Sequence, residues 1–194
     1  MGQLSFFSVA LAEPRLEDLG GLLAAHGQAL LNNTGARVSI LLADQWRAEA
    51  LVQACRAREL DADILRVDGP ATFLVRTERR IELLPVARAF TRGAVKSIPE
   101  NLQVTPGWLW CWAVAAGRED GTGYLLGMDP HAPDTHERLL EVCARAGLAG
   151  TMIGIRGGGP GVRIVGHRRL ERLVEILGEP PTGAPPAAFP SVGH

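Results

Sequence analysis

The stretch 107–117, GWLWCWAVAAG, limits the possible folds of this chain more than any other part of the sequence. From Leu109 to Ala116, apolar residues recur at i, i+3, i+4 and i+7, and the positions between them are also apolar. This pattern predicts a helix that is apolar on nearly every side. Thr105 is a suitable N-cap, and Pro106 at the first helical position loses no hydrogen bond. Such a helix has no polar face to expose to water, so we expect it at the centre of the molecule.

A second stretch, 19–27 with the sequence LGGLLAAHG, is also short and rich in small residues. Small residues continue along the central helix from Cys111 to Gly117. The distance between two packed helices depends on the side chains at their contact, so small side chains allow a close approach. The sequence therefore predicts that these two helices pair as a common axis.

Both stretches contain residues of one known pattern. The segment that leads into and through the central helix matches it at Phe90, Gly93, Lys96, Ile98, Pro99, Leu102, Thr105, Pro106, Leu109, Trp112 and Gly117. The earlier nonamer matches at Leu19, Gly21, Leu22, Ala25 and Gly27. With these residues the chain resembles the LAGLIDADG homing endonucleases in their two-repeat, single-chain form, over about residues 16–177. The resemblance implies an α+β fold of two pseudo-symmetric αββαββα repeats, which form a saddle-shaped pair of antiparallel sheets.

The local patterns agree with this plan. In the first repeat we expect helices over 16–26, 45–60 and 80–90, and strands over 28–31, 36–43, 62–67 and 72–76. In the second we expect helices over 107–117, 135–146 and 168–177, and strands over 123–128, 151–155 and 162–165. The first LAGLIDADG-like repeat would then span residues 1–90, the inter-repeat linker 91–106 and the second repeat 107–178. Because prolines are frequent in 179–194, we predict a flexible tail there.

The catalytic positions implied by the resemblance are degenerate. In the family, an acidic residue just before the final glycine of each signature helix holds a divalent metal at the scissile phosphates. The matching positions here are His26 and Ala116. A methyl group cannot ligate a metal, and a single imidazole is a poor partner for Mg²⁺, which prefers oxygen. We therefore expect no enzymatic activity, no catalytic residue, no bound metal and no cofactor.

Two acidic groupings leave a metal site open as an alternative. The pair Asp120-Gly121 would supply a carboxylate in a rival register, although a hairpin turn explains it more simply. Four potential ligands also lie close together in the sequence at Asp129, His131, Asp134 and His136. The same segment, however, has the residues of a helix N-terminus.

Basic residues on the predicted strands and linker are the candidate nucleic-acid contacts. They are Arg66, Arg76, Arg156 and Arg163 on strands, with Arg92 and Lys96 in the linker. Arginine can bind both O6 and N7 of guanine in a major groove, and linker cations can bind phosphates. The alternative is that each is an ordinary solvated residue. The chain has 20 Lys and Arg against 21 Asp and Glu, a net charge of −1, so any DNA-binding face has to be local.

Together these features favour a non-cleaving, double-stranded DNA-binding protein derived from a homing endonuclease, with a regulatory or genome-maintenance role. Degenerate domains of this kind occur in WhiA-like bacterial sporulation regulators, although those add a helix-turn-helix. We expect a cytoplasmic monomer with an internal pseudo-dimer and no membrane association, because no long apolar segment is present. A repurposed protein- or ligand-binding scaffold is the main alternative, and residual endonuclease or RNA maturase activity is a lesser one.

Overall fold

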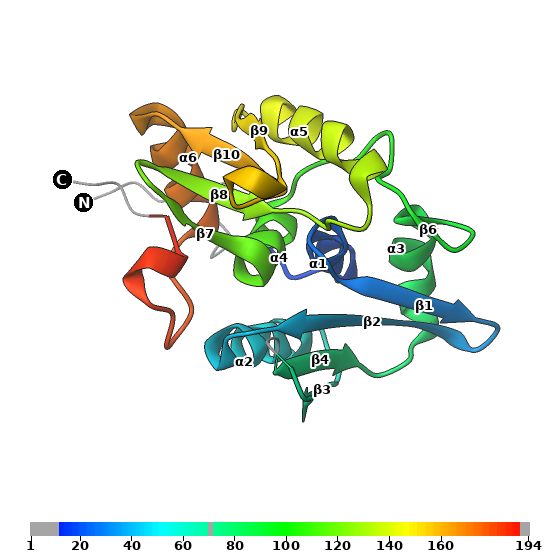
Figure 1. Ribbon diagram of the computed structural model, residues 1–194. Coiled ribbons are helices and arrows are strands. Elements are labelled where there is room, and N and C mark those ends of the chain that lie inside the picture. The colour runs from blue at the N-terminus through cyan, green and yellow to red at the C-terminus, as the bar shows by residue number, and fades with distance from the viewer. Residues whose placement is uncertain (1–11, 70–71, 191–194) are drawn as a thin grey trace.

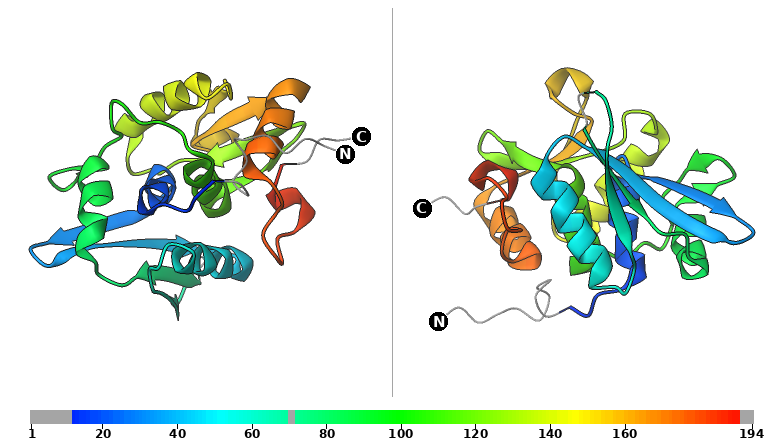
Figure 2. Two further views of the ribbon diagram at one scale, coloured as in Figure 1. Left: turned by 180° about the vertical axis from the view of Figure 1, so that it is seen from behind. Right: turned by 90° about the horizontal axis from the view of Figure 1, so that it is seen from below.

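The structure is a computed structural model that describes residues 12–69 and 72–190. Its centre is a pair of helices, α1 (Gly20–Ala24) and α4 (Pro106–Ala116), with one four-stranded antiparallel sheet on either side (Figure 1). The same arrangement is visible from behind in Figure 2. The predicted α+β class with two sheets around a central helix pair is confirmed.

Sheet one belongs to the first half of the chain. It contains β1 (Gln28–Asn32), β2 (Gly35–Leu42), β3 (Ala62–Arg66) and β4 (Phe73–Thr77), in the order β1-β2-β4-β3. Two helices, α2 (Gln45–Arg56) and α3 (Leu84–Ala89), contact the sheet. Side chains alternate between the faces of a strand. Accordingly Val38, Ile40 and Val75 are buried, whereas their strand neighbours remain partly or fully exposed.

Sheet two repeats this topology in the second half. It contains β7 (Gly117–Asp120), β8 (Gly123–Gly127), β9 (Thr151–Ile153) and β10 (Gly161–Val165), in the order β7-β8-β10-β9. The helices α5 (His136–Arg145) and α6 (His167–Leu177) contact β10. In each sheet the order is therefore first, second, fourth and third strand. A small hairpin, β5 (Thr91–Arg92) and β6 (Val95–Lys96), lies between the two halves.

The α1–α4 contact is as close as the small residues predict. A Cβ atom added to Gly21 would lie 2.1 Å from the Trp108 carbonyl oxygen and 2.8 Å from the Trp112 backbone nitrogen. Both neighbours are backbone atoms of α4, which cannot move aside as a side chain can. Glycine at this position is therefore a requirement of the helix pairing.

Helix α4 is buried along almost its whole length, as its composition predicts. The Thr105 hydroxyl oxygen accepts a hydrogen bond from the Trp108 backbone N–H at 3.0 Å, which confirms Thr105 as the N-cap. The rings of Trp108 and Trp112 meet edge to face, with centroids 5.3 Å apart. Trp112 Nε1 donates to the Gly127 carbonyl oxygen at 2.7 Å, so this large side chain is buried with its polar atom satisfied.

Several helices are shorter than expected. The predicted helix 16–26 consists of a 3₁₀ turn, Leu16–Leu19, followed by the five-residue α1, because Ala25 leaves the helical conformation at ψ −141°. The predicted helix 80–90 likewise begins as a 3₁₀ turn, Ile81–Leu83, ahead of α3. Among the described residues, no helix is long and apolar enough to span a bilayer.

The proline-rich segment packs against the body of the protein within the part that the structure describes. A 3₁₀ turn at Pro186–Ala188 contacts β7, and Ala188 and Phe189 are buried. The buried Tyr124 hydroxyl donates to the Ala188 carbonyl oxygen at 2.9 Å. We expected a flexible tail here, but these contacts fix residues up to Phe189 because the segment supplies an apolar ring and a hydrogen-bond acceptor to sheet two.

Candidate nucleic-acid interface

The face of sheet one that points away from the buried core is defined here as its outer face. Directly paired residues of antiparallel strands have side chains on the same side. The register Gln28–Ser39–Arg76–Asp63 therefore places these four residues on one face, opposite to the buried Val75. Arg76, a predicted site residue, lies on this outer face.

Arg37 is an outer-face cation that the sequence interpretation missed. It is paired with Leu30 and lies two residues before Ser39 on β2, so it shares the face of Arg76. Its Nε atom finds no hydrogen-bond acceptor among the described residues. Arg37 and Arg76 thus form the pair of cations on the outer face of sheet one.

Arg66 lies on the wrong face for the predicted role. It is paired with Phe73, whose side chain is buried on the covered face, and its guanidinium carbon lies 5.1 Å above the Phe73 ring. Both Arg66 and Arg76 were predicted as nucleic-acid contacts on strands. They point to opposite sides of the sheet, because the register places Arg76 opposite Asp63, three residues before Arg66.

The outer face of sheet two also has two cations. The register places Arg118, Leu125, Arg163 and Thr151 in one row across β7, β8, β10 and β9. Arg163 Nε lies 3.0 Å from Asp120 Oδ2, and its Nη2 donates to the Asp120 backbone carbonyl at 3.2 Å. The hairpin interpretation of Asp120-Gly121 is confirmed, and this carboxylate serves as the ion partner of Arg163.

Two other predicted contacts lie outside the sheets. Arg156 was expected on a strand over 151–155 and its continuation, but β9 ends at Ile153 and Arg156 is exposed in a 3₁₀ turn. The chain leaves the strand to form the 3₁₀ turn Ile155–Gly157, which Gly158 closes in the left-handed conformation with a φ of +86°. Arg92 is on β5 and makes a long, exposed ion pair of 3.7 Å with Glu100.

Lys96 is not available to phosphates. Its Nζ donates to Asp129 Oδ2 at 2.7 Å and to the Ala25 carbonyl at 3.1 Å, and its side chain is only 9% exposed. Burial lowers the pKa of Lys96, because its hydrogen bond and ion pair with Asp129 offset only part of the desolvation. The prediction of a phosphate contact is wrong for Lys96, since its ammonium group caps the end of α1 inside the protein.

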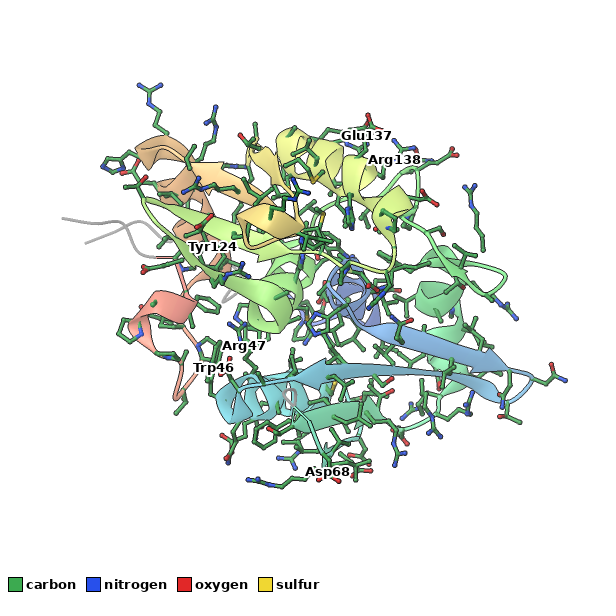
Figure 3. The ribbon with its side chains drawn as sticks, in the orientation of Figure 1. Trp46, Arg47, Asp68, Tyr124, Glu137 and Arg138 are labelled. Carbon is green, nitrogen blue, oxygen red and sulfur yellow. The ribbon has the colours of Figure 1, made fainter. Side chains whose placement is uncertain are left out.

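Arg47 has the corresponding place at the end of α4. Its Nη1 donates to the Val114 carbonyl at 2.6 Å, its Nη2 to the Gly117 carbonyl at 2.8 Å, and its Nε to Asp44 Oδ2 at 2.9 Å. Figure 3 shows Arg47 and Trp46 between the start of α2 and the end of α4. The carboxyl end of a helix carries partial negative charge, so a guanidinium stabilises it.

The two capping cations are held in the same way. Asp44 is the second residue after β2, and Asp129 is the second residue after β8. Each carboxylate pairs with a cation that caps the central helix of the other repeat, Arg47 on α4 and Lys96 on α1. Desolvation would raise the pKa of Asp129, but the hydrogen bonds from Lys96 and the His131 backbone, with the nearby charges, hold it below its usual value.

A pocket of about 540 Å³ opens at the carboxyl ends of α1 and α4, between the two sheets. His26 and Ala116 both line it, together with Arg47, Asp44 and Arg118. His26 Nε2 donates to the Leu41 carbonyl oxygen at 2.7 Å. The pocket thus brings His26 and Ala116 together, and its charged lining residues are Arg47, Asp44 and Arg118.

Comparison with known proteins was made at three levels. No protein-family model matches the chain, and no curated protein sequence does. Among solved structures, the homing endonuclease I-WcaI bound to its DNA recognition sequence is similar, with a TM-score of 0.62 and 13% identity over 91% of this chain and 83% of that one. I-DmoI in complex with DNA and Mn has a TM-score of 0.53 and 14% identity, over 84% of this chain and 96% of that one. Mesophilic variants of I-DmoI reach a TM-score of 0.50 with the same identity and coverage.

The chain has the LAGLIDADG homing endonuclease fold. Helices α1 and α4 are the paired signature helices of that fold, and His26 and Ala116 stand at their ends. The metal implied by the fold does not fit these residues, because hard divalent cations need oxygen ligands. Of the potential ligands around Asp129, the carboxylate itself is taken by Lys96, and among the described residues no three His, Cys, Asp or Glu side chains gather as a metal site.

The sequence prediction did not include three of the arginines that the structure places on the outer faces and at the end of α4. Arg37 and Arg118 were not selected, although alternation along their strands would have identified both once the register was known. The sequence pattern did not identify Arg47 as a capping residue, because a basic residue in the first turn of a helix is usually solvated. Its role depends on the packing of α2 against α4.

Proposed function

We propose that this protein binds duplex DNA across the outer faces of its two sheets without cutting it. The observation that carries the proposal is the placement of two arginines on each outer face, Arg37 and Arg76 on sheet one and Arg118 and Arg163 on sheet two. Arginine binds phosphates and guanine edges. Two antiparallel sheets with one open face each suit two segments of a major groove.

The solved neighbours support the DNA-binding part. One is bound to its DNA recognition sequence and another is in complex with DNA and Mn. We assign to this chain only the location of the DNA-binding surface, because at 13% and 14% identity its side chains can differ from those of the two neighbours. A regulatory or genome-maintenance role is consistent with binding that leaves the duplex intact.

The proposed absence of cleavage is supported by the residues at the ends of α1 and α4. A metal at these ends would have to replace Arg47 at the α4 carbonyl oxygens, and Arg47 is held there by three backbone carbonyls and Asp44. The guanidinium group of Arg47 and a divalent cation are both positive, so their repulsion at contact distance disfavours metal binding beside Arg47. Arg47 and Lys96 neutralise the helix ends, which leaves no requirement for metal in binding.

The decisive experiment is a fluorescence-anisotropy titration of a labelled mixed-sequence duplex at low salt, with EDTA and with Mg²⁺. We expect equal affinity in both buffers, because the capping cations are part of the chain. Arg118→Ala with Arg163→Ala, or Arg37→Ala with Arg76→Ala, should weaken binding and lower the log–log salt slope by about 0.9 for each phosphate contact removed. The matched control is Arg66→Ala, which removes an arginine from the covered face and should leave affinity unchanged.

Two results would refute this function. A wild-type protein that fails to bind duplex DNA at low salt would remove the nucleic-acid proposal. Plasmid cleavage with Mg²⁺ or Mn²⁺ that is abolished by Asp120→Ala would refute the non-cleaving part and assign a catalytic carboxylate to the β7–β8 hairpin.

A second candidate, a ligand-binding scaffold, is favoured by the pocket at the signature-helix ends. Its walls combine apolar residues such as Leu41, Met128 and Ile155 with the charged Arg47 and Asp44. The near-neutral charge of −1 also favours a partner other than nucleic acid. Failure of DNA binding in the titration above would make this scaffold function the leading one.

A further inference from the structure

The outer face of sheet one has an uncovered row of leucines. The register places Leu41, Leu74 and Leu65 directly opposite one another on β2, β4 and β3. Leu41 is 44% exposed and Leu65 is 37% exposed, and Leu30 on β1 is 58% exposed on the same face. We name Leu41, Leu74 and Leu65 the leucine row. A contiguous apolar patch of this kind on a protein surface marks an interaction site.

The neighbours of the leucine row identify the kind of partner. Arg76 lies two residues after Leu74 on the same strand, and Arg37 lies on the adjacent β2, both on the outer face. The strand residues of this face include two arginines and one carboxylate, Asp63, so in a symmetric contact between two copies both facing patches would have a net positive charge. A partner whose apolar groups are surrounded by negative charge is more complementary to the outer face of sheet one.

DNA has this combination in its major groove. The C5-methyl group of thymine is the apolar group that a base edge presents there, and phosphates flank it on both sides. We infer that the leucine row contacts thymine methyl groups, so that the half-site under sheet one is thymine-rich. This inference rests on the proposed DNA-binding function and specifies what one half of that surface recognises.

Sheet two lacks an equivalent apolar row. Its outer-face Leu125 is fully buried and stands between Arg118 and Arg163 in the cross-strand row. This half presents guanidinium groups on both sides of Leu125, and its partly exposed Ile153 and Val165 lie in separate rows opposite glycines, so they form no apolar row. Arginine pairs with guanine O6 and N7. The recognised duplex is therefore asymmetric, with methyl contacts in one half only.

The test uses uracil, which lacks the C5-methyl group of thymine but pairs in the same way. A duplex is first enriched by the wild-type protein from a randomised library, and then remade with deoxyuridine in one half at a time. Substitution in the sheet-one half should weaken binding about fourfold for each contacted methyl, the equivalent of one buried methyl-sized group. Substitution in the other half should have little effect.

Two variants assign the effect to the leucines. Leu41→Ala and Leu65→Ala are exposed substitutions that should leave the fold intact, and each should reduce the difference between thymine and uracil duplexes. The control is Val95→Ala, a change at an exposed apolar residue of the β5–β6 hairpin outside sheet one, which should retain the full difference. Circular dichroism verifies that all three variants are folded.

The outcomes separate this inference from the function on which it rests. If the protein binds the enriched duplex but uracil substitution leaves affinity unchanged in both halves, the leucine row does not contact thymine and DNA binding still stands. If the protein enriches and binds no duplex, both fail. If uracil weakens binding but Leu41→Ala and Leu65→Ala keep the full effect, other residues contact the methyl groups and the assignment is wrong.

Discussion

At the scale of single residues, the buried ion pair of Lys96 and Asp129 joins three parts of the chain. Asp129 follows β8, Lys96 belongs to the β5–β6 hairpin, and Gln28 of β1 donates to the same carboxylate at 3.3 Å. Removing one partner of a buried pair leaves an uncompensated charge, which costs more than the pair itself contributes.

Lys96→Met should therefore lower the free energy of unfolding by about 3–5 kcal/mol, measured by urea denaturation. The double variant Lys96→Met with Asp129→Leu should recover most of this loss, because no isolated charge remains. A single variant as stable as the wild type would mean that Asp129 is solvated or finds another cation.

The pH dependence gives an independent check of the pair. Because the pKa of Asp129 is held below its usual value, its contribution to stability is complete above the unfolded pKa of about 3.9 and is lost as pH falls through the folded pKa. Asp129→Asn should remove this part of the acid destabilisation in thermal melts at decreasing pH.

Single residues also explain where sequence reasoning reached its limit. Thr105 and Pro106 predicted the start of α4 correctly, because capping depends on local backbone geometry. Lys96 was assigned to phosphates wrongly, because its partner lies 33 residues away and a lysine in a linker is usually exposed. Long-range pairs of this kind have no signature in local pattern.

At the scale of secondary-structure elements, the contact between α1 and α4 depends on glycine. Gly21→Ala should destabilise the protein by about 1–3 kcal/mol, because the new methyl group meets backbone atoms of α4. Thermal and urea denaturation measure the loss. The matched control is Gly154→Ala, where φ is −84° and no atom lies within 4 Å, so stability should stay the same or rise slightly. Equal stability of both variants would refute close pairing of the two helices.

The strands show what periodicity can and cannot establish. Apolar runs and turn residues predicted the approximate bounds of seven strands, but they gave no bounds for β7 and no hairpin at β5 and β6. The pairing of α1 with α4 was predicted from small residues. The face of Arg66 was not predicted, because one residue of register moves a side chain to the opposite side of a sheet. The prediction for Arg156 failed because β9 ends at Ile153 and the chain forms a 3₁₀ turn at Ile155–Gly157.

At the scale of the whole molecule, the proline-rich segment crosses from sheet two toward α2. Phe189 is buried near the second repeat, and a Cβ added to Gly183 would lie 3.5 Å from Trp46 Cβ at the start of α2 (Figure 1). Its docking contributes to the stability of both halves together.

Phe189→Ala should lower the melting temperature, with a loss of about 3 kcal/mol at most, because the segment can detach when its anchor is lost. Thr182→Ala, an exposed change in the same segment, should stay within about 0.5 kcal/mol of wild type. A Phe189→Ala protein that melts as the wild type does would show that the segment contributes nothing to stability.

Because the cations that cap α1 and α4 come from outside the repeat that each helix belongs to, they also affect folding during translation. The emerging first half contains Arg47 before its acceptors on α4 exist, and α1 must wait for Lys96 and for Asp129 before its end is neutralised. Domains usually fold as units while synthesis proceeds. Here the first repeat can acquire these contacts only after the chain has been translated as far as Asp129, well into the second repeat, so the first half cannot complete its fold as an independent unit.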